Sequence, residues 1–319
     1  MRKTGEKVVS LCLVLLMAAS VLSACGNTIP EPENHVAETD GVKLWWAYNT
    51  ENFMQELEYD YDRDSTLRLY GIKGDVESIQ LMVTPDKDVI DYDFTMGDVT
   101  TENGAVISAD HFEVYAEHYM QIESTYNPNT VSGYYPDALI PLENYRARGC
   151  NSIDAGNNQG IWLNLNIPAD AQAGTYTGKG RLMLDGEKYI IPVELTVYDL
   201  TMPEEVHPQS AYVLWYDYVA SGEGNASPEM NENYFWFLAN KRVMPDQPGP
   251  HITNDYATYA DYVAQNLAEN PTISSYGLPY AVTNIDGVNH LDESCVLSLL
   301  NHLADKNIAL RQAGNTSID

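Results

Sequence analysis

Basic residues are scarce in this chain. Only 17 of its 319 residues are Lys or Arg, against 46 Asp or Glu, and the formal net charge is −29 at pH 7. Nucleic-acid binding depends on Lys and Arg side chains that displace the counterions of the phosphates, so this composition excludes nucleic acid as a partner. The acidic surface indicates solubility and by itself points to no other partner.

Cysteine is also rare, with four residues. Because no cysteines or histidines have the close spacing typical of a structural zinc site, the sequence predicts neither a metal nor a cofactor. Cys12 lies in the apolar N-terminal stretch and Cys25 directly follows it, which leaves Cys150 and Cys295. We assign these two to different domains, so no disulfide is expected between them.

The N-terminus has an apolar run, Val8–Val21, that is too short to span a membrane comfortably. Three basic residues precede it and Leu22-Ser23-Ala24-Cys25 follows it, an order that resembles a bacterial lipobox. We predict a lipoprotein signal peptide over residues 1–24 and a lipidated Cys25 that anchors the mature protein to the membrane at the bacterial cell surface. An ordinary signal peptide is the alternative. Residues 25–40, rich in Pro, Glu and Asn, predict a disordered tether.

The clearest pattern lies in Gln159–Tyr198. Ile161, Leu163 and Leu165 alternate with polar residues, which is the period of a strand with one buried face. Asp185-Gly186 predicts a tight hairpin between two further strands, and Pro192 suggests that the last of them lies at a sheet edge.

Shorter alternating segments precede this stretch. They predict strands at Val42–Tyr48, Leu67–Tyr70, Ile79–Thr84 and Ile90–Phe94, and from Phe112 to Tyr119. Residues 126–156, rich in Asn, Pro, Tyr and Gly, predict a long loop in which Tyr134, Tyr135 and Tyr145 either pack or touch a sugar. We therefore predict a β-sandwich over residues 41–202.

The pattern changes after a stiff linker at Thr201–Pro208. The predicted elements are strands at Ala211–Val219 and Ile273–Val282 and helices at Asn231–Asn240, Tyr256–Leu267 and Glu293–Asp305. Strands that alternate with helices indicate βα units around a parallel sheet.

Several motifs of the sandwich resemble the N-terminal domain of glycoside hydrolase family 123 and its relatives. The matching residues are Ile167, Pro168, Ala171, Ala173, Gly174, Tyr176, Gly178, Pro192, Val193, Leu195, Val197 and Pro203. Glu77–Leu81 and Tyr135–Leu142 also fit, and the resemblance extends from Gly41 to the C-terminus. It implies that residues 209–319 are the N-terminal part of a (β/α)₈ barrel. A barrel takes roughly 250 residues, so we expect a truncated chain; a small independent α/β domain is the alternative.

The resemblance also implies a chemistry. Family 123 enzymes are retaining β-N-acetylgalactosaminidases in which the substrate's acetamido group is the nucleophile, an adjacent Asp orients it, and a Glu protonates the leaving oxygen. Asp292-Glu293 has this order, but no apolar strand is predicted before it and a helix follows. An Asp cap and a first-turn Glu are typical of a helix start. We therefore assign no catalytic residue within the chain.

Barrel enzymes bind ligands at the C-terminal ends of the strands. The substrate-binding candidates are Tyr212, Trp215, Tyr216, Asp217 and Tyr218, with Tyr280 and Asn284 at a later strand; packing is the alternative role for each. No role is assigned to His207, His251 or His290. Two functions remain open: a surface-anchored glycoside hydrolase acting on glycans, and a noncatalytic carbohydrate-binding or scaffold lipoprotein.

Overall fold

The protein folds into two compact units that divide between Met202 and Pro203. The structure is a computed structural model that describes residues 37–39, 41–59, 63–123, 131–206, 210–224, 227–245, 256–270, 272–273, 275, 282–291 and 293–312. The predicted signal peptide, Cys25 and most of the predicted tether lie outside these residues. No helix of the described part is long and apolar enough to cross a membrane.

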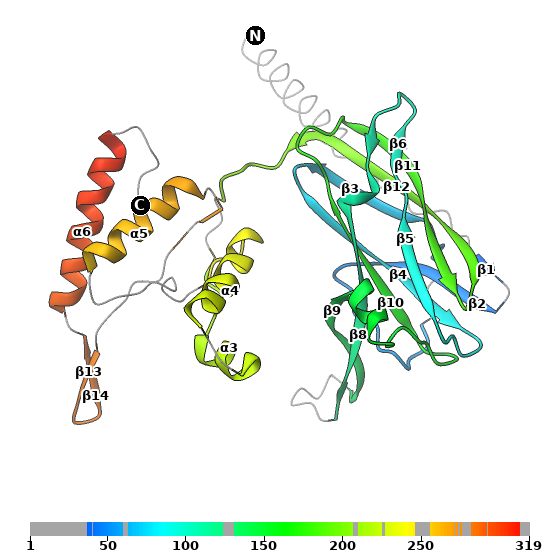
Figure 1. The fold of residues 1–319 in the computed structure, drawn as a ribbon, viewed down its shortest axis with the longest axis horizontal. Coiled ribbons are helices and arrows are strands. Elements are labelled where there is room, and N and C mark those ends of the chain that lie inside the picture. The colour runs from blue at the N-terminus through cyan, green and yellow to red at the C-terminus, as the bar shows by residue number, and fades with distance from the viewer. Residues whose placement is uncertain are drawn as a thin grey trace, which may run out of the picture. The chain divides into compact units, whose positions relative to one another are not determined.

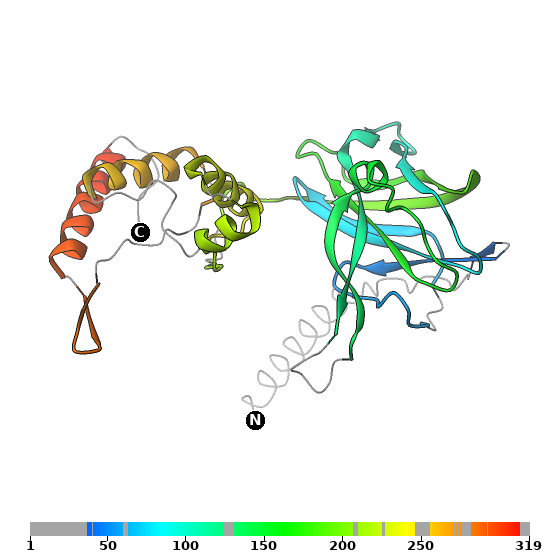
Figure 2. The ribbon, with the colours of Figure 1, turned by 60° about the horizontal axis from the view of Figure 1, so that its bottom comes forward.

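The first unit is a β-sandwich of two sheets that face each other as layers (Figure 1, Figure 2). In spatial order the first sheet contains β1 (Ala37–Thr39), β2 (Val42–Tyr48), β4 (Val76–Pro85), β10 (Gln159–Asn166), β8 (Phe112–Ile122) and β9 (Gly133–Pro141). The second contains β3 (Leu67–Lys73), β12 (Glu187–Thr201), β11 (Gly174–Leu184), β6 (Val99–Thr101) and β7 (Val106–Ile107), while β5 (Tyr92–Met96) pairs with β11. All pairs are antiparallel except β3 with β12.

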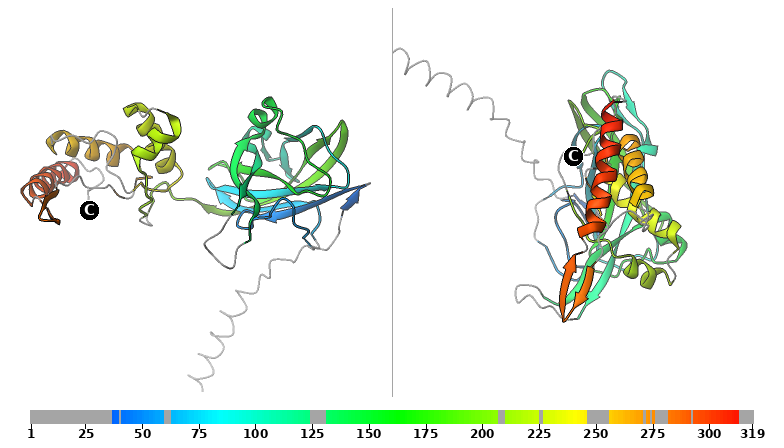
Figure 3. Two further views of the ribbon diagram at one scale, coloured as in Figure 1. Left: turned by 90° about the horizontal axis from the view of Figure 1, so that it is seen from below. Right: turned by 90° about the vertical axis from the view of Figure 1, so that its left-hand side faces the viewer.

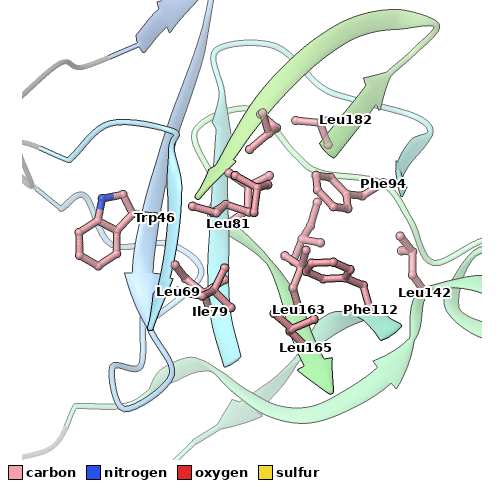
Figure 4. Packing of buried hydrophobic residues seen from close by; sticks show 14 of the residues in the cluster. Trp46, Leu69, Ile79, Leu81, Phe94, Phe112, Leu142, Leu163, Leu165 and Leu182 are labelled. Carbon is pink, nitrogen blue, oxygen red and sulfur yellow. The ribbon is translucent and has the colours of Figure 1, made fainter. Parts of the chain in front are cut away.

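The core lies between the two sheets and consists of the apolar residues that alternate along their strands (Figure 4). Leu163 and Leu165 of β10 and Leu81 of β4 are at most 1% exposed. On the other sheet, Leu182 and Leu195 are fully buried against them. The period of two in the sequence therefore correctly predicts which side chains enter the core.

Two details of the predicted strands are wrong. Pro192 does not mark an edge, because β12 lies between β3 and β11. The pairing with β3 begins only at Val193, so the proline, which has no N–H, lies one residue outside that ladder. Ile90 was expected on the buried face with Tyr92 and Phe94, yet it is 80% exposed, since β5 begins two residues later.

The predicted long loop at residues 126–156 is also wrong over much of its length. It contains β9, which pairs with β8, and a short helix, α2 (Leu142–Ala147). Tyr145 packs in the core, as one of the two interpretations held, while Tyr134 and Tyr135 are half-buried on β9. Antiparallel pairing with β8, the strand that precedes it in the chain, stabilises β9 despite its Gly and Pro residues, whose local preference is for a loop.

The second unit is mainly helical in its described part. Its helices are α3 (Tyr216–Glu223), α4 (Pro228–Asn240), α5 (Tyr256–Glu269) and α6 (Glu293–Gln312). A hairpin of β13 (Val282–Ile285) and β14 (Val288–Leu291) precedes α6. Helix α6 lies beside α5 (Figure 3). Tyr259 and Val263 of α5 and Leu299 of α6 form one buried cluster.

The three predicted helices are confirmed, but the predicted strand at Ala211–Val219 is wrong. Residues 211–215 form no strand apart from an isolated bridge at Tyr212, and α3 begins at Tyr216. Leu214 and Val219 share one buried cluster with Phe235 of α4, and the left-handed Gly224 ends the helix. A run of apolar and aromatic residues fits a strand or a helix, and here packing against α4 favours the helix.

Candidate functional site

The residues predicted to contact a sugar lie at the start of the second unit, where an extended segment turns into α3. Tyr212, Trp215 and Tyr218 are 61%, 48% and 67% exposed. The rings of Trp215 and Tyr218 are in contact, with centroids 4.9 Å apart and planes tilted by 44°. The structure therefore brings two of the five candidates together on an exposed aromatic surface.

The backbone around Tyr212 fixes one side of this surface. The Tyr212 N–H donates to the carbonyl oxygen of Met244 at 2.7 Å, and Tyr212 forms a parallel bridge with Pro245. The backbone N–H of Met244 in turn donates to Oγ of Ser210 at 3.0 Å. Tyr212 is thus attached to the segment that follows α4.

The other two candidates are placed differently. Tyr216 is half-buried against the cluster around Leu214, and burial raises the pKa of its hydroxyl to about 12, with Tyr262 contributing. Its hydroxyl is therefore neutral at physiological pH and can donate a hydrogen bond. Asp217 is exposed in the first turn of α3, where a carboxylate stabilises the helix N-terminus.

A short strand precedes Asp292-Glu293. This strand, β14, ends at Leu291 and all four of its residues are exposed, so it is not the buried apolar strand whose absence was predicted. This strand forms an antiparallel hairpin with β13, which contains Asn284, and Glu293 begins α6. Asp292 itself lies outside the described residues.

Among the residues that the structure describes, the remaining candidates form no site. Tyr280, His207 and His251 lie outside the described residues, and His290 is exposed on β14. The thiol of Cys150 is free and exposed. Among the described residues, no three His, Cys, Asp or Glu side chains lie together as metal ligands would.

The sandwich has a buried carboxyl group that sequence reasoning missed. Glu117 of β8 is 2% exposed, and burial raises its pKa to about 7, while the Tyr119 hydroxyl opposes the rise. A Cβ atom at Gly160 on the neighbouring strand would lie 2.1 Å from the Glu117 Oε2 atom. Glycine therefore makes room for this carboxyl group, which has no access to a substrate in solution.

Glu77 is the counterpart of Glu117 on the other face of the same sheet. It is half-buried, and burial together with the charge of Asp75 raises its pKa to about 7. A Cβ atom at Gly71 would lie 2.7 Å from its Cγ atom. Each of these two carboxyl groups thus lies against a glycine, and burial raises the pKa of each to about 7.

Two clefts open on the sandwich. The larger, of about 510 Å³, lies where β5, β8 and α2 meet, and its polar lining comes from Asp93, Thr95, Glu113, Tyr115, Glu143 and Arg146. The other, of about 280 Å³, is lined among others by Lys43, Trp45 and Tyr59. Sequence reasoning missed the larger cleft, because its residues come from segments far apart in the chain.

Comparison with known proteins identifies a related family. The family model described as the glycoside hydrolase 123 N-terminal domain matches residues 46–183. No curated protein matches the chain.

Among solved structures, the chain is similar to a family 123 glycoside hydrolase from Clostridium perfringens, studied for glycolipid glycan hydrolysis. The identity is 15%, the match covers 86% of this chain and 47% of that one, and the TM-score is 0.47. The chain therefore spans about half the length of that enzyme.

Two weaker similarities are to bacterial surface proteins. Self-complemented MyfA, the major subunit of Myf fimbriae from Yersinia enterocolitica, is 11% identical, with 47% of this chain and 99% of that one covered and a TM-score of 0.24. The Salmonella SafD adhesin is 8% identical, with 50% and 99% covered and a TM-score of 0.26. These likenesses carry no functional argument. The family model is the more specific finding: residues 46–183 match the glycoside hydrolase 123 N-terminal domain, so this part of the chain is related to glycoside hydrolase family 123.

Proposed function

We propose that this chain is the N-terminal portion of a glycoside hydrolase that acts on glycans containing N-acetylgalactosamine. The observation that carries the proposal is the family match over residues 46–183. Those residues form a sandwich, which supplies a scaffold, so the chemistry would come from the unit that follows it.

We further propose that the second unit begins a (β/α)₈ barrel. The bridge between Tyr212 and Pro245 is parallel, and the chain between them contains α3 and α4. Two parallel segments joined through helices have the connectivity of a βα unit. The Ser275 hydroxyl donates to the Ser210 carbonyl oxygen at 3.1 Å, which brings a third segment beside the first. The antiparallel hairpin of β13 and β14 would be an insertion in this pattern.

In this proposal the substrate lies against the aromatic surface at the start of α3. Tyr212, Trp215 and Tyr218 would offer ring faces to the sugar, and Tyr216 and Asp217 would contribute a hydroxyl and a carboxylate. The resemblance implies substrate-assisted cleavage by an Asp-Glu pair. The only such pair in the sequence, Asp292-Glu293, lies at the start of α6, so we place the catalytic pair outside these 319 residues.

Activity measurements test the proposal. We expect this chain to release no product from an aryl β-N-acetylgalactosaminide, since general acid–base assistance is worth roughly 10²–10⁴-fold. A longer product of the same gene that includes a complete barrel should release it. Turnover by the chain itself that Glu293→Gln abolishes would show that the pair at α6 is catalytic. No turnover by the longer product would favour the noncatalytic carbohydrate-binding alternative.

We also propose that Cys25 is the lipidated N-terminus of the mature protein and anchors it at the bacterial cell surface. The support is the order of basic, apolar and small residues before this cysteine. Cys25→Ser should move the protein out of the membrane fraction and stop the incorporation of labelled fatty acid. Continued incorporation into the variant would contradict the lipobox interpretation.

A further inference from the structure

The outer face of the first sheet, which points away from the sandwich core, is divided into two parts. One part is covered by residues 49–59. Trp45 of β2 packs there against Phe53, with ring centroids 4.8 Å apart. The side-chain amide of Asn158 donates to the carbonyl oxygens of Met54 and Leu57, which holds the covering segment in place.

The other part of the outer face has two aromatic side chains next to each other. The strand register pairs Trp162 of β10 with Tyr115 of β8 and, one row along, Asn164 with Glu113. Their sequence neighbours enter the core, so alternation places these four on the outer face. Trp162, Tyr115 and Asn164 are half-buried and Glu113 is exposed, in contrast to the buried Trp45.

A chain of hydrogen bonds holds these side chains in one arrangement. The Trp162 indole N–H donates to the Asn164 side-chain oxygen at 2.7 Å, and the Ser78 hydroxyl donates to the same atom at 2.8 Å. The Asn164 amide and the Tyr115 hydroxyl donate to Oε2 of Glu113 at 3.3 and 3.0 Å. Within the described part of the chain, Oε1 of Glu113 has no hydrogen-bond partner. The rings are therefore fixed, and an acceptor beside them remains open to a ligand.

The same strand also borders the larger cleft, since Glu113 and Tyr115 are among its lining residues. Its volume of about 510 Å³ lies within the range of roughly 300–1,000 Å³ that is typical of ligand sites. On the far side, Arg146 of α2 forms an ion pair with Asp93 at 2.9 Å. The lining contains this one guanidinium group and three carboxylates, those of Asp93, Glu113 and Glu143. An anionic ligand would be repelled here, whereas a neutral ligand with many hydroxyl groups would find both donors and acceptors.

We propose that Trp162, Tyr115, Glu113 and the adjoining cleft form a glycan-binding surface for a neutral oligosaccharide. The two aromatic rings offer flat apolar faces for sugar rings, and Glu113, Asn164 and Arg146 exchange hydrogen bonds with the hydroxyl groups. This goes beyond the hydrolase proposal: the surface lies on the sandwich and needs no catalytic group. It would bring the protein to its glycan whether or not hydrolysis follows.

Calorimetric titration of the chain tests this without any turnover. The probes are a neutral tetrasaccharide that ends in N-acetylgalactosamine, the same tetrasaccharide with one sialic acid added, and tetralysine. We expect binding of the neutral probe. Trp162→Ala should weaken it about tenfold, because truncation of a central aromatic contact commonly costs that much. Glu113→Ala changes an exposed residue and should weaken binding without affecting folding, while Glu102→Gln, outside the cleft lining, should leave it unchanged.

Three results would overturn the proposal: no binding of the neutral probe by the folded chain, binding that Trp162→Ala and Glu113→Ala leave intact, or equal binding of the sialylated probe. If tetralysine alone binds and both variants abolish this, the surface is a site for a cationic peptide. All of these outcomes are independent of hydrolysis, so a failure here is distinguishable from a failure of the proposed hydrolase function.

Discussion

The two units of this chain bury their apolar residues in different ways. In the sandwich, both sheets contribute to one continuous core that extends from Leu44 to Val197. In the second unit the described residues form separate small clusters, one around Phe235 and one around Tyr259. Aromatic residues such as Tyr218 and Phe237 remain more than 60% exposed there.

This difference follows from how each unit covers its apolar surface. Each sheet of the sandwich covers one face of the other, so the core needs no further element. In the second unit, α5 and α6 cover each other, but the aromatic residues at the start of α3 have no such cover in the described chain. Exposed apolar patches of this kind are typical of surfaces that contact a ligand or another protein segment.

The largest expected effect is a difference in cooperative unfolding between the two units when each is produced alone. We expect a fragment of residues 37–202 to unfold in one cooperative transition, because its core is complete without the rest of the chain. A fragment of residues 203–319 should show no cooperative transition, since small separate clusters bury too little apolar surface. Thermal unfolding followed by circular dichroism measures both. A cooperative transition in the second fragment would show that the comparison is wrong.

A truncation in the sandwich core should have the next largest effect. Leu163→Ala removes a side chain that is 1% exposed at the centre of the core, and we expect the free energy of unfolding to fall by about 2–5 kcal/mol. Ile190→Ala on β12 is the matched control, because Ile190 is exposed and its truncation should change the free energy by less than about 0.5 kcal/mol. Urea titration of both variants gives the comparison. Equal losses would contradict a core that lies between the sheets.

The close approach of Gly160 to the Glu117 carboxyl group gives a third test of the packing in the sandwich. Gly160→Ala would place a Cβ atom 2.1 Å from the carboxyl oxygen, so the side chain or the strand must shift, at a cost of about 1–3 kcal/mol. In the second unit, Gly222 of α3 has nothing within 4 Å of its Cβ position. Gly222→Ala should stabilise its helix by about 0.5–1 kcal/mol. If Gly222→Ala destabilised the protein as much as Gly160→Ala does, the close packing around Glu117 would be contradicted.

The last expected effect concerns pH, and it is gradual because it is spread over several pH units. In the folded protein burial raises the pKa of Glu117 to about 7, whereas its ordinary pKa is near 4.5. Between these two pH values the folded protein keeps a proton on Glu117 that the unfolded chain has lost. Protonation of Glu117 therefore contributes fully to the free energy of unfolding below the pKa of the unfolded chain, and this contribution is lost as the pH rises through about 7. Each such group changes the free energy of unfolding by at most about 1.4 kcal/mol per pH unit in this window.

Glu117→Gln should remove this contribution. We expect the variant to gain less stability than the wild type when the pH is lowered from 7.5 to 5. Glu77→Gln should act in the same direction, since burial and Asp75 raise the pKa of Glu77 as well. Glu102→Gln, at an exposed turn, is the control. Urea unfolding at several pH values measures the difference, and identical pH profiles for wild type and Glu117→Gln would count against a protonated buried carboxyl group.

Local patterns in the sequence predict much of the sandwich. The alternation of Ile161, Leu163 and Leu165 gives both the strand and its buried face, because side chains alternate strictly along a strand. Asp185-Gly186 correctly predicts the hairpin between β11 and β12, where both residues have positive φ. The helices α4, α5 and α6 also follow from local spacing.

The tertiary structure decides what depends on partners distant in the sequence. Pro192 lies in an internal strand because β3, more than 100 residues earlier in the chain, pairs with the residues that follow it. Residues 133–141 form a strand because they pair with β8, the preceding strand, which their own composition does not reveal. The proposed glycan surface has the same origin: the sequence predicts a wet face for Trp162 but not that Tyr115 lies opposite it. Glu117 is buried because Gly160 lies on the adjacent strand, a relation that only strand register creates. Periodicity along one segment determines which way a side chain points, whereas the neighbours it meets depend on how the strands pair.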